Sequence, residues 1–297
     1  MSMDFYAGVD GGGTKTRLRC VTREGEVVRE EVFDSFNYNS IGETSFRALL
    51  SKMTAVLCQT GDCKGLLIGC AGISNREMMR ILHEEMEKAA IPLAVRTDGA
   101  IALEGALEGA AGIALIAGTG SICLGKARDG HEERSGGWGH LIGDEGSGYA
   151  LGRDALIAVT KEMDGYGPAT MLTQLVADKE KLTDRSALIS YAYGGDKSRI
   201  AALSVLTQEA AEKGDDVALA ILTANARALC ATAFSVADKL ELQEADLALL
   251  GGLFEHDTLF RRELIRLTKE LRPKMRCMEP LHDALYGAVS LSLRTFA

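Results

Sequence analysis

Two kinds of hydrophobic pattern alternate along the chain. Short, continuous apolar runs predict strands, and segments with apolar residues every three or four positions predict helices. In the first third, strands are predicted over residues 4–9, 16–22, 65–71 and 93–97. A helix is predicted over residues 43–58, because one face carries Phe46, Leu49, Leu50, Met53, Val56 and Leu57.

Two further helix starts are predicted from polar residues. Ser74 and Glu77 have the spacing of a capping box, which predicts a helix that continues to about Ala90. Asp98 stands between a predicted strand and a segment rich in Ala and Leu, so we expect it to cap a helix.

The pattern restarts near Gly112. Strands are predicted over 113–117, 122–126 and 247–250, and helices over most of 149–240, over 258–271 and over 282–294. Alternating strands and helices predict an α/β fold. The restart predicts a domain boundary near residue 111.

Composition narrows the functional classes. The chain has 297 residues, more than one average domain, and 46% of them are apolar, which suffices for large cores. The formal net charge of −9 argues against a nucleic-acid partner, because phosphate backbones require a basic face. ATP remains compatible, since backbone amides and magnesium supply a positive field.

Targeting and redox signals point to the cytoplasm. The first residues, MSMDFYAGVDGG, do not resemble a signal peptide, and we expect no apolar segment of membrane-spanning length. Seven cysteines without a CxxC pair are typical of reduced cytosolic thiols. Cys58 and Cys63 are the closest pair, but their spacing is not that of zinc or iron–sulfur motifs.

A glycine-rich turn, DGGGTKT, follows the first apolar run. Its glycines permit close backbone approach, and its amides can point at phosphate oxygens. Its hydroxyl and ammonium groups would add contacts, and its aspartate would hold magnesium, through water. The alternative is a glycine-rich hairpin turn without a ligand. The candidate residues are Asp10, Gly11, Gly12, Gly13, Thr14 and Lys15.

A second turn, AGTGS, follows the apolar run 113–117 and has the same chemistry. Its candidates are Thr119, Gly120 and Ser121, with the two hydroxyl groups as donors. Two such turns suggest a nucleotide held between two related halves. Gly251 and Gly252, between a predicted strand and a helix, would let a flat adenine lie against the backbone, although such a pair is also a common turn.

Two further segments carry candidate chemistry. An ionised Asp98 at a helix N-terminus can accept a proton from a sugar hydroxyl as that oxygen attacks a γ-phosphate. Residues 136–148 (GGWGHLIGDEGSG) contain the only tryptophan, Trp138, beside Asp144 and Glu145, which suits a carbohydrate. The alternative for this segment is a structured loop with Trp138 as a core anchor and His140 packed within it.

Together these motifs resemble the N-acetylglucosamine kinase branch of the BadF/BadG/BcrA/BcrD family, in the sugar kinase/Hsp70/actin superfamily, over nearly the whole chain. DGGGTKT and GTGS resemble its two phosphate motifs, and LLGG resembles its adenosine motif. Thr97-Asp98 matches the segment that holds its catalytic base. Asn37, five residues before Gly42, matches its sugar-binding turn, and GGWGHLIGDEGS is similar to its most specific motif.

The resemblance implies two actin-like (ribonuclease H-like) domains around a central nucleotide cleft. The first would span residues 1–111, with a helix of about 282–297 (ALYGAV, with Gly287) returning to it. The second would span 112–281 and contain a helical insertion. ATP and Mg²⁺ are the implied cofactors, the 6-hydroxyl of an amino sugar is the implied acceptor, and a homodimer is expected. The implied sugar-binding residues are Asn37, Gly72, Asp98, Gly137, Trp138 and Asp144.

Departures from the family pattern leave the substrate open. FNYNSIG replaces the commoner Gly-Pro-x-Asn form, and Cys70-Ala71-Gly72 stands where relatives carry other turns. N-acetylglucosamine, glucosamine and simple hexoses remain candidates. Two other functions are considered: an ATPase that activates a 2-hydroxyacyl-CoA dehydratase-type electron-transfer system, for which the cluster-ligating cysteines are missing, and a non-catalytic sugar or nucleotide sensor.

Overall fold

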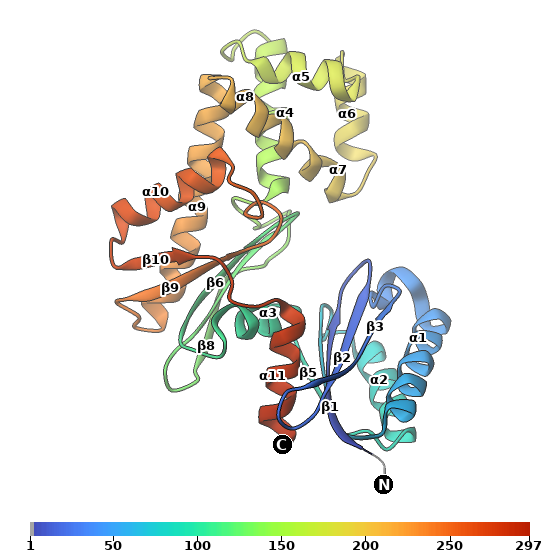
Figure 1. Cartoon of the computed structure of the whole chain (residues 1–297). Coiled ribbons are helices and arrows are strands. Elements are labelled where there is room, and N and C mark those ends of the chain that lie inside the picture. The colour runs from blue at the N-terminus through green and yellow to red at the C-terminus, as the bar shows by residue number, and fades with distance from the viewer. Residues whose placement is uncertain (1–2) are drawn as a thin grey trace. The chain divides into compact units, whose positions relative to one another are not determined.

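The computed structural model describes residues 3–297, and these residues form two compact units (Figure 1). Unit 1 contains the described residues up to Ala110 together with Pro280–Ala297, and unit 2 contains Ala111–Glu279. Each unit has its own hydrophobic core.

Unit 1 contains, among the described residues, a five-stranded sheet in the order β3-β2-β1-β4-β5. The central strand β1 pairs antiparallel with β2 and parallel with β4. Strand β3 pairs antiparallel with β2, and β5 pairs parallel with β4. The strands are β1 (Asp4–Gly11), β2 (Thr16–Val21), β3 (Val27–Phe33), β4 (Asp62–Cys70) and β5 (Leu93–Arg96).

Helices cover both faces of this sheet. Phe5 and Val9 of β1 belong to the core shared with the first two helices, whereas Tyr6 packs against Val289 of the last helix. This division follows from the alternation of side chains along a strand. The helices of unit 1 are α1 (Tyr38–Thr60), α2 (Arg76–Lys88), α3 (Asp98–Leu107) and α11 (Ala284–Phe296).

Glycines allow α11 to pack closely within unit 1. A Cβ atom on Gly287 would lie 1.9 Å from the carbonyl oxygen of Ile101 in α3. A Cβ atom on Gly8 of β1 would lie 2.5 Å from the backbone nitrogen of Val289. The C-terminal helix therefore contacts both α3 and the central strand at backbone distance.

The sheet of unit 2 repeats this topology in the order β10-β9-β6-β7-β8. Its strand β6 pairs antiparallel with β7 and parallel with β9, as β1 does with β2 and β4. The strands are β6 (Gly112–Ala117), β7 (Ser121–Lys126), β8 (Glu132–Gly136), β9 (Ala245–Leu250) and β10 (Met275–Met278). The predicted α/β class is confirmed, and the second sheet begins where the hydrophobic pattern restarts.

The helices of unit 2 lie mostly between β8 and β9 in the chain. They are α4 (Gly148–Met163), α5 (Met171–Glu180), α6 (Arg185–Tyr193), α7 (Lys197–Ala202), α8 (Ser204–Glu212), α9 (Asp216–Lys239) and α10 (Leu259–Leu271). By length and composition alone, α9 could cross a membrane, so the expectation that no segment has this property is wrong. Its residues Leu222, Leu229 and Val236 are buried in the core of unit 2, and core helices pass the same test.

Helix starts differ from the sequence predictions in three places. Asn75, not Ser74, caps α2, and its side chain accepts hydrogen bonds from two backbone N–H groups. Thr97, not Asp98, caps α3. The first helix begins at Tyr38, not at residue 43, and bends at Gly42, where φ is 73°. For α2 and α3, a polar residue one position away caps the helix.

Strands β3, β8 and β10 were not predicted. All three lie at sheet edges, and their sequences are VVREEVF, EERSG and MRCM. Edge strands face solvent along one side and carry charged residues, so they lack the continuous apolar run that identifies a central strand.

Candidate active site

The candidate residues of unit 1 gather at one edge of its sheet. Because β1, β4 and β5 are parallel, their carboxyl ends meet there, and ligands of α/β sheets commonly bind outside such ends. The register pairs Gly11 with Cys70, and Gly69 with Arg96. The glycine turn, Gly72 and Asp98 each follow one of these strand ends, so three segments distant in sequence reach the same edge.

The first glycine turn is a tight hairpin that leaves its tip open. It joins β1 to the antiparallel strand β2, and Gly12 N donates a hydrogen bond to Lys15 O at 3.1 Å. The hairpin alternative therefore describes its backbone correctly, without excluding a ligand. Thr14 and Lys15 are exposed, and Lys15 forms no ion pair with a residue that the structure describes.

A cavity of about 210 Å³ lies against this turn. It brings together five of the sequence candidates, which are Gly11, Gly12, Gly13, Asn37 and Gly72. It is also lined by residues that sequence reasoning did not select, namely Phe36, Tyr38, Asn39, Ala71, Asn75 and Met78. Three of the phosphate candidates and two of the sugar candidates thus share one pocket.

The wall that carries Asn37 is fastened to the glycine turn. Phe36 N donates to Gly12 O at 3.0 Å, and the hydroxyl of Ser35 donates to Gly13 O at 2.7 Å. Asn37 occupies the N-cap position of α1, but its side chain makes no capping hydrogen bond. Because the amide of Asn37 is exposed and not used as a cap, it is available to a ligand at this pocket.

Asp98 is the first residue of α3 and is exposed. Its Oδ1 accepts a hydrogen bond from Gly99 N at 2.9 Å, and the free N–H groups of the helix start favour a negative charge there. Burial, with a further contribution from the charge of Asp98, raises the pKa of the Cys70 thiol to about 12. Cys70 therefore stays a neutral thiol beside the carboxylate.

Asp10 belongs to an ion-pair chain. Arg17 donates to Asp10 Oδ2 at 2.8 Å and to Asp283 Oδ2 at 2.6 Å. Within residues 3–297, the other oxygen of Asp10 accepts no hydrogen bond, so it can accept one from a metal-bound water. This single oxygen suits Mg²⁺, which keeps several waters. No group of three or more His, Cys, Asp or Glu side chains in the same residue range could hold a metal.

The candidates of unit 2 also meet at the carboxyl edge of their sheet. Strands β6 and β9 are parallel, and Ile116 pairs with Leu250. The turn 118–120 and the pair Gly251-Gly252 follow directly. A Cβ atom on Gly251, where φ is 95°, would lie 2.4 Å from the carbonyl oxygen of Ala117. The two glycine segments of unit 2 are therefore in contact, with Thr119 and Gly252 exposed.

The acidic end of the glycine-rich loop holds the second turn. Asp144, 4% exposed, accepts a hydrogen bond from Ser121 N at 3.3 Å, and the Ser121 hydroxyl donates to Glu145 O at 2.8 Å. A hydroxyl has one proton, so Ser121 uses its own to fasten the loop. Contacts of Ser121 with phosphate and of Asp144 with a sugar stay predictions.

Asn225 of α9 supports the same loop, and sequence reasoning did not identify it. This side chain is 5% exposed. Its Oδ1 accepts from Gly146 N at 3.1 Å, and its Nδ2 donates to Asp154 Oδ2 at 2.9 Å and to Ile221 O at 3.0 Å. Buried polar groups require partners, but the burial of Asn225 and its partner Gly146, 79 residues away, are visible only in the fold.

The middle of the loop is exposed and apolar. Trp138 is 64% exposed, Leu141 83% and Ile142 76%. The guanidinium of Arg134 lies 5.1 Å from the centre of the Trp138 ring. The core-anchor interpretation of Trp138 is therefore wrong, and contacts of Trp138 and Gly137 with a carbohydrate stay predictions. His140 packs edge-on against Tyr149, with 4.8 Å between ring centres.

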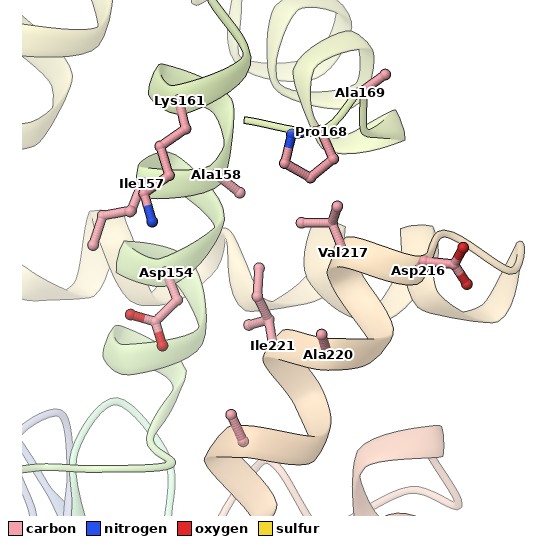
Figure 2. Close-up of a pocket in the computed structure, with 11 residues that line it drawn as sticks. Asp154, Ile157, Ala158, Lys161, Pro168, Ala169, Asp216, Val217, Ala220 and Ile221 are labelled. Atoms are coloured by element: carbon pink, nitrogen blue, oxygen red, sulfur yellow. The ribbon is translucent and has the colours of Figure 1, made fainter. Parts of the chain in front are cut away.

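A larger cavity, of about 700 Å³, lies between α4 and α9 and contains none of the candidate residues. Figure 2 shows Ile157 and Lys161 of α4 opposite Val217 and Ile221 of α9. Asp154, which accepts the hydrogen bond from Asn225, also lines it. Besides aliphatic side chains, its lining contains the charged residues Asp154, Lys161 and Asp216.

Comparison with known proteins places these features in context. The model of the BadF/BadG/BcrA/BcrD ATPase family matches residues 7–292. An N-acetylmuramic acid/N-acetylglucosamine kinase of Clostridium acetobutylicum is 33% identical over 301 residues, which cover 98% of each chain. An N-acetyl-D-glucosamine kinase of Dictyostelium discoideum is 33% identical over 317 residues and 99% of each chain. A crystal structure from Chromobacterium violaceum, provisionally named an N-acetylglucosamine kinase, has a TM-score of 0.74 and 28% identity, and the match covers 99% of this chain and 100% of that one.

Proposed function

The chain belongs to the BadF/BadG/BcrA/BcrD ATPase family, and we propose that it is a sugar kinase that transfers the γ-phosphate of ATP to the 6-hydroxyl of an amino sugar. N-acetylglucosamine is the proposed substrate. Two relatives that align over nearly the full chain are named as kinases of N-acetylglucosamine, one of them also of N-acetylmuramic acid. One structural observation carries the proposal: the glycine turn, the Asn37 turn and Asp98 follow or adjoin strand ends at one edge of the unit 1 sheet.

Asp98 is the proposed general base. The sugar O6 attacks the γ-phosphorus, its proton passes to the carboxylate of Asp98, and ADP is the leaving group. The exposed position of Asp98 at the start of α3 suits this role, because the helix N-terminus stabilises the carboxylate before the proton arrives. Asn37 and Gly72 would bind and orient the sugar. We propose the same for Gly137, Trp138 and Asp144 of unit 2.

The phosphates would be bound mainly by backbone groups. Gly11, Gly12 and Gly13 with Thr14 and Lys15 form one proposed phosphate site, and Thr119, Gly120 and Ser121 form a second. Gly251 and Gly252 are proposed to contact the adenosine. Mg²⁺ would be held through water by Asp10 and would neutralise phosphate charge. Each assignment can be tested independently by substitution.

An ADP-release assay with Mg²⁺-ATP and a panel of hexoses and amino sugars tests the function. Asp98→Asn should lower kcat by about 10²–10⁴-fold with KM for the sugar little changed, because a positioned base contributes in that range. Asp178→Asn, an exposed carboxylate on α5, is the matched control and should keep wild-type turnover. Near-normal turnover in Asp98→Asn would contradict the base assignment.

The same assay separates the alternative functions. An electron-transfer activator would hydrolyse ATP without sugar dependence and would bind iron. A sensor would bind sugar or nucleotide without releasing ADP. We also propose that the protein is a homodimer, which light scattering of the purified protein would test. We further propose that it acts in the cytoplasm, without nucleic-acid or membrane partners.

A further inference from the structure

Two asparagines form a hydrogen-bonded pair at the unit 1 pocket. Asn39 lies in the first turn of α1, and Asn75 caps α2. Both line the cavity that contains the glycine turn and Asn37. Asn75 Nδ2 donates to Asn39 Oδ1 at 3.1 Å. The pair therefore joins the starts of two helices at the wall of the cavity.

The orientation of both amides follows from the capping interaction. Asn75 Oδ1 accepts hydrogen bonds from Glu77 N and Met78 N, both at 3.1 Å. Only the oxygen of an amide can accept two N–H donors, so the nitrogen of Asn75 must be directed elsewhere. That nitrogen meets Asn39, whose oxygen must therefore face it. Neither amide can be flipped without breaking these bonds.

This arrangement leaves an excess of donors. The oxygen of Asn75 is fully used, and the oxygen of Asn39 has one lone pair left. Asn39 Nδ2 makes no hydrogen bond with any residue in the described part of the chain. Two N–H groups of Asn39 and one of Asn75 thus remain available. Such a pair favours an acceptor oxygen, and it offers little to an ammonium group.

We propose that Asn39 and Asn75 determine substrate specificity by donating hydrogen bonds to an acyl oxygen on a substituent of the sugar. This inference rests on the proposed kinase function and refines it, because it favours N-acylated or carboxylated sugars over glucosamine and simple hexoses. The acyl oxygen is either the carbonyl of a 2-acetamido group or the carboxylate of a 3-lactyl group. Both are acceptors without a competing positive charge.

Steady-state kinetics with N-acetylglucosamine, N-acetylmuramic acid, glucosamine and glucose tests the proposal. Asn39→Ala should lower kcat/KM for the acylated sugars by about tenfold, mostly through KM, because one hydrogen bond to a neutral or charged acceptor is lost. For glucose and glucosamine the change should stay within about twofold. If only N-acetylmuramic acid is affected, the lactyl carboxylate is the bound group. If both acylated sugars are affected alike, the acetamido carbonyl is bound.

Two more variants make the test specific. Asn39→Asp replaces donors by acceptors, so it should reduce activity on N-acetylglucosamine and improve the relative activity on glucosamine, whose ammonium it attracts. Asn75→Asp keeps the cap of α2 but removes the donor, and it should shift specificity in the same direction. Ser40→Ala, which changes the next residue in the chain and does not line the cavity, is the control.

The outcomes separate this proposal from the proposed function. If the wild-type protein phosphorylates none of the sugars, the kinase proposal fails first. If it is active but Asn39→Ala lowers kcat/KM equally for all four sugars, the specificity role of the pair is refuted while the kinase function stands. A wild-type preference for glucosamine over N-acetylglucosamine would also refute it.

Discussion

The hydrogen bonds of Asn225 predict that a single buried amide controls the order of the glycine-rich loop of unit 2. Asn225→Ala removes the acceptor of Gly146 N and the donor to Asp154. The third bond, to Ile221 O, lies within α9. The substitution does not weaken the helix through its intrinsic propensity, because alanine is a better helix former than asparagine. Any loss of stability must therefore come from the lost contacts.

The size of the destabilisation depends on whether water can reach the partners that Asn225 leaves unpaired. Gly146 is buried, so its N–H would remain unsatisfied, which costs about 1–3 kcal/mol. The Asp154 side chain is 27% exposed and can be hydrated, so losing the hydrogen bond from Asn225 to Asp154 adds little to the destabilisation. The carbonyl of Ile221 keeps its place in the helix. We expect a decrease of about 2 kcal/mol in the free energy of unfolding, or roughly 4–8 °C in Tm.

Two measurements test this expectation. Thermal unfolding gives the stability, and fluorescence anisotropy of Trp138, the only tryptophan, reports on the order of the loop. Asn225→Ala should lower both. Thr232→Ala, on the same helix, is the control, because its hydroxyl bonds only Ala228 O within α9. A change in Asn225→Ala no larger than that of the control would refute the anchoring role.

Two predictions concern unit 1. Gly287→Ala should lower the free energy of unfolding by about 3 kcal/mol, because the new Cβ atom would overlap Ile101 O. Helix propensity alone would raise the free energy of unfolding, so an unchanged or higher denaturation midpoint would contradict the close packing. Burial raises the pKa of Asp283, but hydrogen bonds from Tyr286 N–H and Arg17 and the charge of Arg17 lower this pKa overall. The ionised carboxylate therefore stabilises the fold above about pH 4, and this stabilisation is lost as the pH falls through the lowered pKa of the folded protein. Asp283→Asn keeps the cap of α11, and this variant should lose less free energy of unfolding than the wild type between about pH 5 and pH 3. The difference should be under 1 kcal/mol, since Arg17 and Asp283 are both partly exposed. Equal stability-against-pH curves for the two proteins would contradict this prediction.

The central strands and both glycine turns could be predicted from the sequence because their signals are local. A continuous apolar run followed by several glycines identifies a buried strand and the turn after it, as at 5–9 and at 113–117. The parallel pairing of β1 with β4 and of β6 with β9 then brings the remaining segments to the same edges. Asp98 was selected because it stands between a strand and a helix, whereas Gly72 was selected only through the family resemblance.

The supporting residues could not be predicted because their partners are remote in the chain. Asn225 is 79 residues from Gly146, and no periodicity connects them. Arg17, which pairs with Asp10, is 266 residues from its second partner, Asp283. Trp138 was predicted to bind a sugar, with a core anchor as the alternative, since composition does not reveal exposure. Only the fold determines which polar side chains find a buried partner.

The position of the cap of α2 determines which groups Asn39 and Asn75 can offer to a ligand. A cap at Ser74 would leave the amide of Asn75 free to turn either way. The cap at Asn75 instead commits its oxygen to α2 and directs its nitrogen to Asn39. Because one oxygen is thereby occupied, the pair becomes a donor for the pocket. The preference for an acyl oxygen is thus a consequence of helix capping, and it would be lost if the helix began one residue earlier.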